Sequence, residues 1–339
     1  MKPRRIALLD TTAYAPTTPL FLGAVRAVAS EVLFLDEYEV FGYRPMPVEE
    51  KVFYRLSNRR PFRFWSFNEM ILDRLCKFQP DVFLVVKGAY LAPGTLRKLK
   101  GRFPFASLVN FATDDPFNPL SSTHNLVESV QYYDLYACTK RAIMQDVRSL
   151  GCRRVEFIPF AYQPEVHFRE CDVADKSVDV TFVGGADDTR IRYFRELVRR
   201  SGISLRLYGG GWERVPDLAR YAGGVITGRE YRLAHSRSKI VVGMVRHSNR
   251  DGHSMRSFEI PACGAFMLAE RTAEHLEMFR ENVEAAYFAS PEEFVEQVAH
   301  FVANEEERTR IAAAGNSLVL NGDHRYSDRL RTILEITRG

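Results

Sequence analysis

The residues with the clearest chemistry lie in the stretch 251–264, which reads DGHSMRSFEIPACG. Ser254 is a residue type that caps helices, and about two helical turns can follow it. The backbone amides of Ser254 and Met255 at the start of this helix, together with the guanidinium of Arg256, can attract an anion such as a phosphate. Glu259, one turn further on, can accept two hydrogen bonds from a vicinal diol such as a ribose. A phosphate and a diol together indicate a nucleotide.

The same stretch also has a purely structural interpretation. Arg256 and Glu259 stand three residues apart, which is the spacing of a surface ion pair on a helix. A short capped helix that leads into the apolar strand 265–269 is ordinary α/β architecture. Spacing alone therefore leaves both interpretations open.

Length and composition limit the class of protein. At 339 residues, with 46% hydrophobic and 27% charged residues, the chain is long enough for two α/β domains. The 47 basic and 43 acidic residues are too evenly balanced for a dedicated nucleic-acid binder and fit an anionic small ligand better. The five cysteines are odd in number and form no Cys-x-x-Cys pair, so neither disulfides nor a zinc site are expected. No stretch resembles a signal peptide or approaches membrane-spanning length, and we expect a cytoplasmic protein.

The first half alternates apolar runs with amphipathic stretches, as in a parallel βαβ sheet. The strands are expected at 6–9, 32–35, 82–86, 105–111, 135–138 and 155–158. The turn after the first of these strands lacks the pattern G-x-G-x-x-G, so NAD binding is not expected there. The segment 37–65 is rich in Tyr, Phe, Arg and Pro; it predicts either an irregular packed insertion, which we favour, or the lining of an acceptor cleft.

Two adjacent carboxylates, Asp114 and Asp115, follow the expected strand 105–111. Ligands of parallel α/β sheets bind beyond the carboxyl ends of the strands, so both are candidates to bind an acceptor hydroxyl or to act as a general base. We favour Asp115 as the base because the proline after it restricts its backbone. The alternative is structural, an Asp-Asp-Pro turn that caps the next helix.

A second α/β series begins near residue 178, after the proline-containing linker 159–164. The glycines Gly184 and Gly185 follow its first strand and allow close approach of a ligand, and Arg190 nearby can reach a pyrophosphate. Three helices are expected at the end of the chain. They begin after Ser290, at Glu305 with an end at Gly315, and near Asp323.

The pattern Arg256-x-Phe258-Glu259-x-Pro261-Ala262-Cys263-Gly264, with an apolar strand after it, resembles the signature of the CgeB-like group of glycosyltransferases. This group belongs to the wider group 1 set, which has the GT-B fold. In the wider group, two acids separated by seven residues face the donor; the second binds the ribose and the first a sugar hydroxyl. Asp251 and Glu259 have this separation, although Asp251 is one methylene shorter than the usual glutamate. The segment 225–231 likewise resembles the turn that flanks the nucleotide base.

The resemblance completes the set of candidate residues. The candidate donor-binding residues are Gly184, Gly185, Arg190, Gly228, Arg229, Asp251, His253, Ser254, Met255, Arg256 and Glu259. Asp115 and Asp114 are the candidate catalytic residues. No metal ligands are expected, because the chain contains no D-x-D motif and no histidine pair at helical metal-site spacing.

The resemblance also implies an α/β protein of the GT-B type, with two Rossmann-like parallel-sheet domains facing a central cleft. Residues 1–165 would bind the acceptor and residues 166–320 the nucleotide sugar, and residues 321–339 would form a helix that crosses back to the first domain. The implied reaction is hexosyl or related transfer to an unidentified glycan, small molecule or protein, without metal or cofactor. Two alternatives stay open, a nucleotide-sugar epimerase of the same fold and a non-catalytic nucleotide-binding protein for assembly or regulation.

Overall fold

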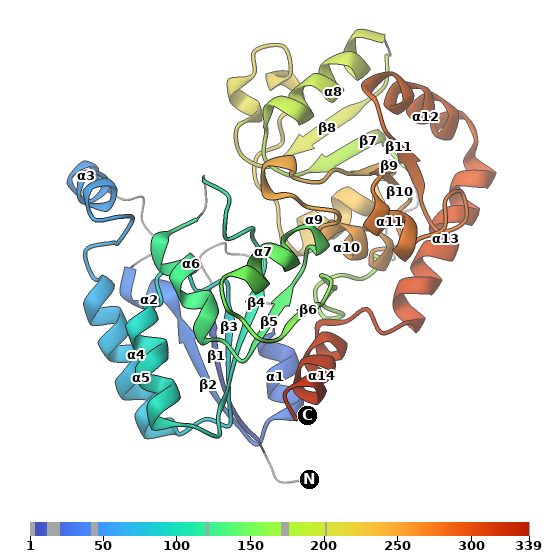
Figure 1. The fold of residues 1–339 in the computed structure, drawn as a ribbon. Coiled ribbons are helices and arrows are strands. Elements are labelled where there is room, and N and C mark those ends of the chain that lie inside the picture. The colour runs from blue at the N-terminus through green and yellow to red at the C-terminus, as the bar shows by residue number, and fades with distance from the viewer. Residues whose placement is uncertain are drawn as a thin grey trace. The chain divides into compact units, whose positions relative to one another are not determined.

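The computed structural model describes residues 4–11, 21–41, 47–119, 122–170, 176–200 and 202–338. The chain divides into two compact units (Figure 1). The first unit comprises residues 1–159, 247–250 and 326–339, and the second comprises residues 160–246 and 251–325. The short segment 247–250, which the sequence assigned to the second domain, therefore belongs to the first unit.

Within the described residues, the first unit has a six-stranded parallel sheet with the strand order β2-β1-β3-β4-β5-β6. Its strands are β1 (Arg5–Asp10), β2 (Glu31–Asp36), β3 (Val82–Val86), β4 (Ser107–Ala112), β5 (Leu135–Cys138) and β6 (Val155–Phe157). In β3 all five residues of the run VFLVV are buried, because a parallel sheet is covered on both faces. The strand order reverses between β1 and β3, where Ala7 pairs with Phe83 on one side and Leu33 on the other. This reversal is the switch point at which such sheets bind ligands.

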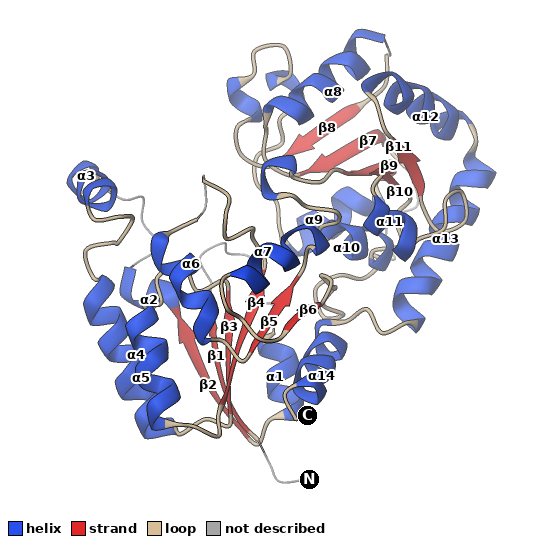
Figure 2. Cartoon of the chain, viewed as in Figure 1, coloured by secondary structure: helices blue, strands red, loops and turns tan. Residues whose placement is uncertain are grey.

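Helices cover both faces of this sheet. The described α-helices of the first unit, not all of which pack on the sheet, are α1 (Leu22–Val28), α2 (Glu37–Phe41), α3 (Val48–Leu56), α4 (Phe64–Phe78), α5 (Pro93–Arg102), α6 (His124–Ser129), α7 (Met144–Ser149) and α14 (Tyr326–Ile336). Figure 2 shows α4 and α5 on one side of the sheet and α1 and α14 on the other. Phe67, Ile71 and Leu75 project from α4 at four-residue intervals into the core.

The segment 37–65 contains helices α2 and α3, which the expectation of an irregular insertion missed. The apolar residues of α3 recur every four residues, at Val48, Val52 and Leu56, and this helical period was hidden among charged and aromatic neighbours. None of the nine residues of α3 is buried.

The second unit has, within the described residues, a five-stranded parallel sheet with the order β11-β10-β9-β7-β8. Its strands are β7 (Val178–Val183), β8 (Leu205–Tyr208), β9 (Ser238–Gly243), β10 (Met267–Glu270) and β11 (Ala286–Phe288). Its helices are α8 (Asp188–Arg200), α9 (Gly228–Ser236), α10 (Arg256–Ala262), α11 (Ala273–Met278), α12 (Pro291–Ala303) and α13 (Glu305–Asn321). The order reverses between β7 and β9, so the segments that leave these two strands flank the switch point of this sheet.

Gly315 does not end its helix as expected. α13 continues through it to Asn321, and a Cβ atom on Gly315 would lie only 2.4 Å from the carbonyl oxygen of Glu284. The glycine therefore marks a close approach of the Glu284 backbone to the helix. A sequence alone cannot distinguish this use of glycine from a helix C-cap.

Candidate functional site

The stretch 251–264 has the expected order of loop, helix and strand, but its helix begins later than expected. α10 begins at Arg256, one residue later than expected; Met255 before it is in helical conformation, and no side chain caps the helix. Gly264 adopts the left-handed conformation, with φ of +71°, and β10 follows. The C-terminal half of the prediction is therefore confirmed, and the N-cap is wrong.

The backbone amide of Ser254 is occupied within the protein. It donates to Oγ of Ser257 at 3.1 Å, and Oγ of Ser257 lies 2.8 Å from Nε2 of His275. Nδ1 of His275 lies 2.7 Å from the carbonyl oxygen of Glu270, so Nδ1 carries the proton and Nε2 accepts from Ser257. Burial lowers the pKa of His275 to about 4, which agrees with a neutral ring. This chain of hydrogen bonds fixes the start of α10, and the expected anion contact from the Ser254 amide is not available.

Glu259, on α10, is held from two sides. Its Oε2 accepts a hydrogen bond from the hydroxyl of Tyr231 at 2.8 Å, and its Oε1 lies 3.5 Å from Nε2 of His167. The amide of Gln163 donates to Nδ1 of His167 at 3.1 Å, so the proton of the neutral ring is on Nε2, facing Glu259. Burial, with the Glu259 carboxylate beside it, raises the pKa of Tyr231, which keeps this hydroxyl protonated. Since each carboxylate oxygen has two lone pairs, Glu259 keeps acceptor positions for two ribose hydroxyls.

Neither Tyr231 nor His167 was anticipated as a partner of Glu259. Tyr231 lies on α9, which begins at Gly228 with φ of +52° and has Arg229 exposed in its first turn. The Tyr231 ring lies 4.1 Å from the ring of His235, whose pKa burial lowers to about 4. The segment 225–231, singled out for its resemblance to a base-flanking turn, contains Tyr231, whereas no sequence signal marked His167.

Three arginines gather at the switch point between β7 and β9. Arg190 is only 3% exposed and donates to one backbone carbonyl after each of these strands, at 2.9 and 3.4 Å. Burial, together with the charges of Arg256 and Arg246, lowers the pKa of Arg190 to about 10, and two acids oppose this shift: Asp187, whose Oδ2 lies 3.1 Å from Nη1 of Arg190, and Asp251. The Nε atoms of Arg190 and Arg256 are buried and have no hydrogen-bond partner in the part of the chain that the structure describes. This cluster has an excess of positive charge and two unused donors, which suits an anion.

His253 has both ring nitrogens occupied by protein groups. Nε2 accepts from the amide of Phe160 at 3.0 Å, and Nδ1 donates to Oε2 of Glu274 at 2.6 Å. The side chain is fully buried. These contacts favour a structural role for His253 in the second unit over the donor contact expected from the sequence.

Protein contacts exclude a side chain at Gly184 and leave only close van der Waals room for one at Gly185. A Cβ atom on Gly184 would lie 2.6 Å from the ring of Phe182, and one on Gly185 would lie 3.4 Å from the carbonyl oxygen of Gly210. Gly209, with φ of +120°, packs directly on Gly184. The close packing of these two turns explains the glycines without a ligand.

Asp114 and Asp115 follow β4 in the first unit, and both form ion pairs. Arg250 binds Asp115 through two hydrogen bonds, at 2.6 Å from Nε and 3.0 Å from Nη2. The amide of Phe117 also donates to Asp115, at 2.9 Å, and closes the turn. Nζ of Lys87 lies 2.6 Å from Asp114. These contacts favour the structural alternative, a turn locked by a bidentate arginine, over the general base.

A further acid, Glu37, lies near the switch point of the first sheet and was not singled out from the sequence. It is 7% exposed, and burial raises its pKa to about 8; Lys87 lowers this pKa, and Asp10 and Asp36 raise it. Lys87 itself has φ of +60°, a strained conformation for a residue other than glycine. A carboxyl group whose pKa is near physiological pH can give or accept a proton. The available signal was the acidic pair Asp36-Glu37, at the junction of β2 and α2.

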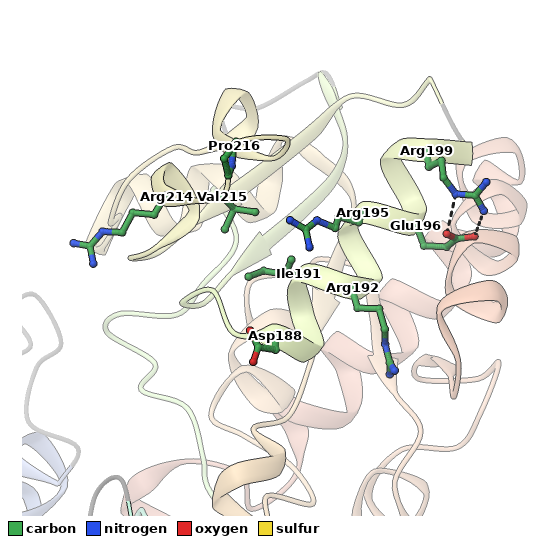
Figure 3. Close-up of a pocket in the computed structure, with 9 residues that line it drawn as sticks. All are labelled: Asp188, Ile191, Arg192, Arg195, Glu196, Arg199, Arg214, Val215 and Pro216. Atoms are coloured by element: carbon green, nitrogen blue, oxygen red, sulfur yellow. Dashed lines mark hydrogen bonds and ion pairs between the residues drawn. The ribbon is translucent and has the colours of Figure 1, made fainter.

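A cavity of about 520 Å³ lies between α8 and the turn 214–216 (Figure 3). It is lined by Asp188, Ile191, Arg192, Arg195, Glu196, Arg199, Arg214, Val215 and Pro216. Arg195 pairs with Asp217 and Arg199 with Glu196, each at 2.7 Å. The cavity includes none of the candidate site residues, and two of its arginines are neutralised on the surface. We therefore place the candidate site at the switch point and not here.

The described residues contain no group of three His, Cys, Asp or Glu side chains arranged to hold a metal ion. No helix in the described ranges is long and apolar enough to cross a membrane.

Comparison with known proteins adds to this geometry. Residues 190–335, which include Arg190, Arg256 and Glu259, match a family model described as Glycosyl transferase-like. Comparison with curated protein sequences gives no match.

Solved structures similar to the chain include sucrose-phosphate synthase from Thermosynechococcus elongatus, with a TM-score of 0.72 and 12% identity over 99% of this chain and 98% of that one. HepE from Anabaena in complex with UDP-glucose has a TM-score of 0.67 and 10% identity over 98% and 99%. A protein assigned as a UDP-N-acetylglucosamine 2-epimerase from Listeria monocytogenes has a TM-score of 0.57 and 12% identity over 99% and 98%. The α/β fold of the GT-B type is thereby confirmed, and the enzyme class indicated is glycosyltransferase.

Proposed function

We propose that the protein is a glycosyltransferase that takes a sugar from a nucleotide-sugar donor bound by the second unit. The observation that carries this proposal is the pairing, around α10, of a diol acceptor with a cluster of arginines. Glu259 would accept hydrogen bonds from the ribose, and Arg190, Arg246 and Arg256 would face the diphosphate. Both features lie inside the region that matches the Glycosyl transferase-like model.

The arginine cluster would supply the main stabilisation of the transition state. As the glycosidic bond breaks, negative charge develops on the departing diphosphate, and a fixed positive field stabilises that charge. Asp251, which lies within electrostatic range of Arg190, is the candidate to contact a sugar hydroxyl. We propose that the reaction needs no metal ion, because the arginines supply the positive charge.

The donor that we propose is a uridine diphosphate sugar, since HepE, which has a similar fold, was solved with UDP-glucose. The pattern from Arg256 to Gly264 supports a narrower assignment to the CgeB-like group. The acceptor is a glycan, a small molecule or a protein that the first unit would bind.

Release of free nucleotide from a panel of UDP-sugars, with water as acceptor, tests this proposal. We expect slow release of UDP from one member of the panel, unchanged by EDTA, because the arginines replace a metal ion. Activity that EDTA abolishes and only a divalent ion restores would contradict the metal-free mechanism. If UDP and the whole panel neither bind nor turn over, the transferase proposal fails for uridine donors.

A second candidate is a nucleotide-sugar epimerase, favoured by the similarity to the Listeria protein over almost the whole chain. The same donor residues would serve it, but turnover would need no acceptor. Appearance of an epimeric UDP-sugar would support this candidate. Tight binding without any turnover would instead support the non-catalytic nucleotide-binding protein.

A further inference from the structure

Exposed large apolar side chains cluster in one segment of the first unit. The described residues contain eleven exposed large hydrophobic side chains, and six of them lie between positions 48 and 65. These six, which we call the α3 patch, are Val48, Val52, Phe53, Leu56, Phe62 and Trp65. Leu56 is 81% exposed and Trp65 is 62% exposed. Figure 1 shows α3 at the edge of the first unit, away from its sheet.

The α3 patch belongs to one locally ordered surface. The rings of Phe53 and Phe62 stack with their centroids 4.5 Å apart, so α3 contacts the segment before α4. In the chain segment between Phe53 and Phe62, the hydroxyl of Ser57 donates to the carbonyl of Arg60 at 2.6 Å, and the amide of Arg59 donates to the carbonyl of Tyr54 at 2.8 Å. A helix with an apolar stripe normally buries it against the protein, and this one leaves it in solvent.

Basic side chains surround the patch. Residues 48–65 contain five basic residues, Lys51, Arg55, Arg59, Arg60 and Arg63, and two acidic ones, Glu49 and Glu50, for a net charge of +3. The contacts given for Arg59, Arg60 and Arg63 are to neutral groups: Ser122, Asn125 and the carbonyl of Val40. The guanidinium of Arg60 also lies over the ring of Trp65, 5.5 Å from its centroid. Exposed aliphatic and aromatic residues mixed with cations are the composition of helices that lie in the headgroup region of a bilayer.

We propose that the α3 patch docks the first unit on the surface of an anionic lipid bilayer. The apolar side chains enter the headgroup region, and the arginines and the lysine bind lipid phosphates. Docking of this kind needs no membrane-spanning helix. A second copy of the chain is a poorer occupant, because a symmetric dimer through this surface would bring two patches of net charge +3 together.

Tryptophan emission provides a direct test. The chain has two tryptophans; Trp212 is fully buried in the second unit, and Trp65 lies in the patch. Vesicles of phosphatidylcholine with one third phosphatidylglycerol should shift the emission to the blue and sediment with the protein. Vesicles of phosphatidylcholine alone should do neither, and salt at about 0.5 M should weaken binding to the anionic vesicles.

Substitutions test whether vesicle binding depends on the α3 patch or is nonspecific adsorption. Val52→Glu/Leu56→Glu should lower the vesicle partition coefficient at least about tenfold, because two apolar side chains that would enter the headgroup region become charges. Lys51→Ala/Arg55→Ala should lower it about fivefold per residue removed, the equivalent of about 1 kcal/mol each. Phe105→Glu is the matched control, since Phe105 is 99% exposed in the same unit but outside the patch, and it should bind as wild type does.

Three outcomes would overturn the proposal. The first is no emission shift and no co-sedimentation with anionic vesicles. The second is equal binding by wild type and Val52→Glu/Leu56→Glu, with circular dichroism showing that both are folded. The third is a concentration-dependent dimer that the same double substitution abolishes, which would make the α3 patch an interface between copies.

Discussion

The switch points of the two sheets differ in charge and in how that charge is neutralised. Among the described residues of the first unit, the acids Asp10, Asp36 and Glu37 lie near Lys87, which also forms an ion pair with Asp114, and Arg250 forms an ion pair with Asp115. In the second unit, three arginines lie within electrostatic range of one another, with Asp187 and Asp251 as counter-charges. The second switch point is suited to an anion. The first repels anions, so a neutral or cationic ligand fits it better.

The two switch points also differ in the environment of a buried carboxyl group. Glu37 is buried among other acids and is held in its neutral form, which costs stability at high pH. Glu259 has the opposite setting, with donors from Tyr231 and His167 on its two oxygens. One carboxyl group is therefore prepared to exchange a proton and the other to accept hydrogen bonds.

The largest effect is expected from Glu37→Gln. Burial raises the folded pKa of Glu37 to about 8, above the ordinary value of 4.5, so the folded state binds the extra proton between these two pH values. The contribution of Glu37 to stability is therefore full below pH 4.5 and is lost as pH rises to about 8. At pH 8 and above, Glu37→Gln should be more stable than wild type by on the order of 3 kcal/mol. Urea unfolding over this pH range measures the free energies of unfolding of wild type and variant. If Glu37→Gln leaves the pH dependence of stability unchanged, the raised pKa of Glu37 is contradicted.

Asp115→Ala should have the next largest effect. It leaves Arg250 without its bidentate partner, and because Arg250 is 37% exposed we expect a loss of about 2 kcal/mol, below the range for fully buried pairs. Denaturant unfolding provides the measurement, with Asp114→Ala as the more exposed control. Unchanged stability with loss of sugar transfer would restore the general-base assignment.

Glu259→Ala tests the second switch point directly. It should weaken UDP binding by about 1–3 kcal/mol, since the ribose hydroxyls lose their acceptor. Titration calorimetry measures the affinity, and Glu296→Ala, an exposed acid on α12, is the control. Equal affinities for wild type and Glu259→Ala would remove the diol assignment.

Tyr231→Phe should have the smallest effect, and the most specific one. Without the hydroxyl, Glu259 is less well oriented, and the preference for UDP over 2′-deoxy-UDP should fall about fivefold, equivalent to about 1 kcal/mol. Tyr287→Phe removes a buried tyrosine hydroxyl elsewhere in the second unit and should cost stability without changing this preference. If Glu259→Ala abolishes the preference for UDP over 2′-deoxy-UDP and Tyr231→Phe retains it, the Tyr231 hydroxyl does not orient Glu259 for ribose binding.

The sequence predicted the structure best where the period of the apolar residues and the local composition determine the secondary structure. The buried strands such as 82–86 and the helix capped by Ser290 follow from local patterns, and both are found. Gly315 was misjudged because a tertiary contact, the close approach of the Glu284 carbonyl, overrides its local preference. Ser254 was misjudged because its amide donates to the nearby hydroxyl of Ser257, which a tertiary contact with His275 orients.

The site was predicted in part for the same reason. Arg190, Arg256 and Glu259 could be singled out because each lies at or near the start of a helix that follows a turn. His167 is 92 positions from Glu259, and Arg250 is 135 positions from Asp115, so no local spacing connects either pair. Such contacts depend on the topology of the chain.

The division of the chain has a practical consequence for dissecting the protein. The first unit takes residues 247–250 and 326–339 from far along the chain, and through Arg250 the first of these segments neutralises Asp115. A fragment that stops at residue 159 would lack α14 and Arg250, and a fragment that starts at residue 160 would carry both without their partners. Neither half is a complete folding unit, so the two would have to be co-expressed as complementing fragments and not cloned as separate domains.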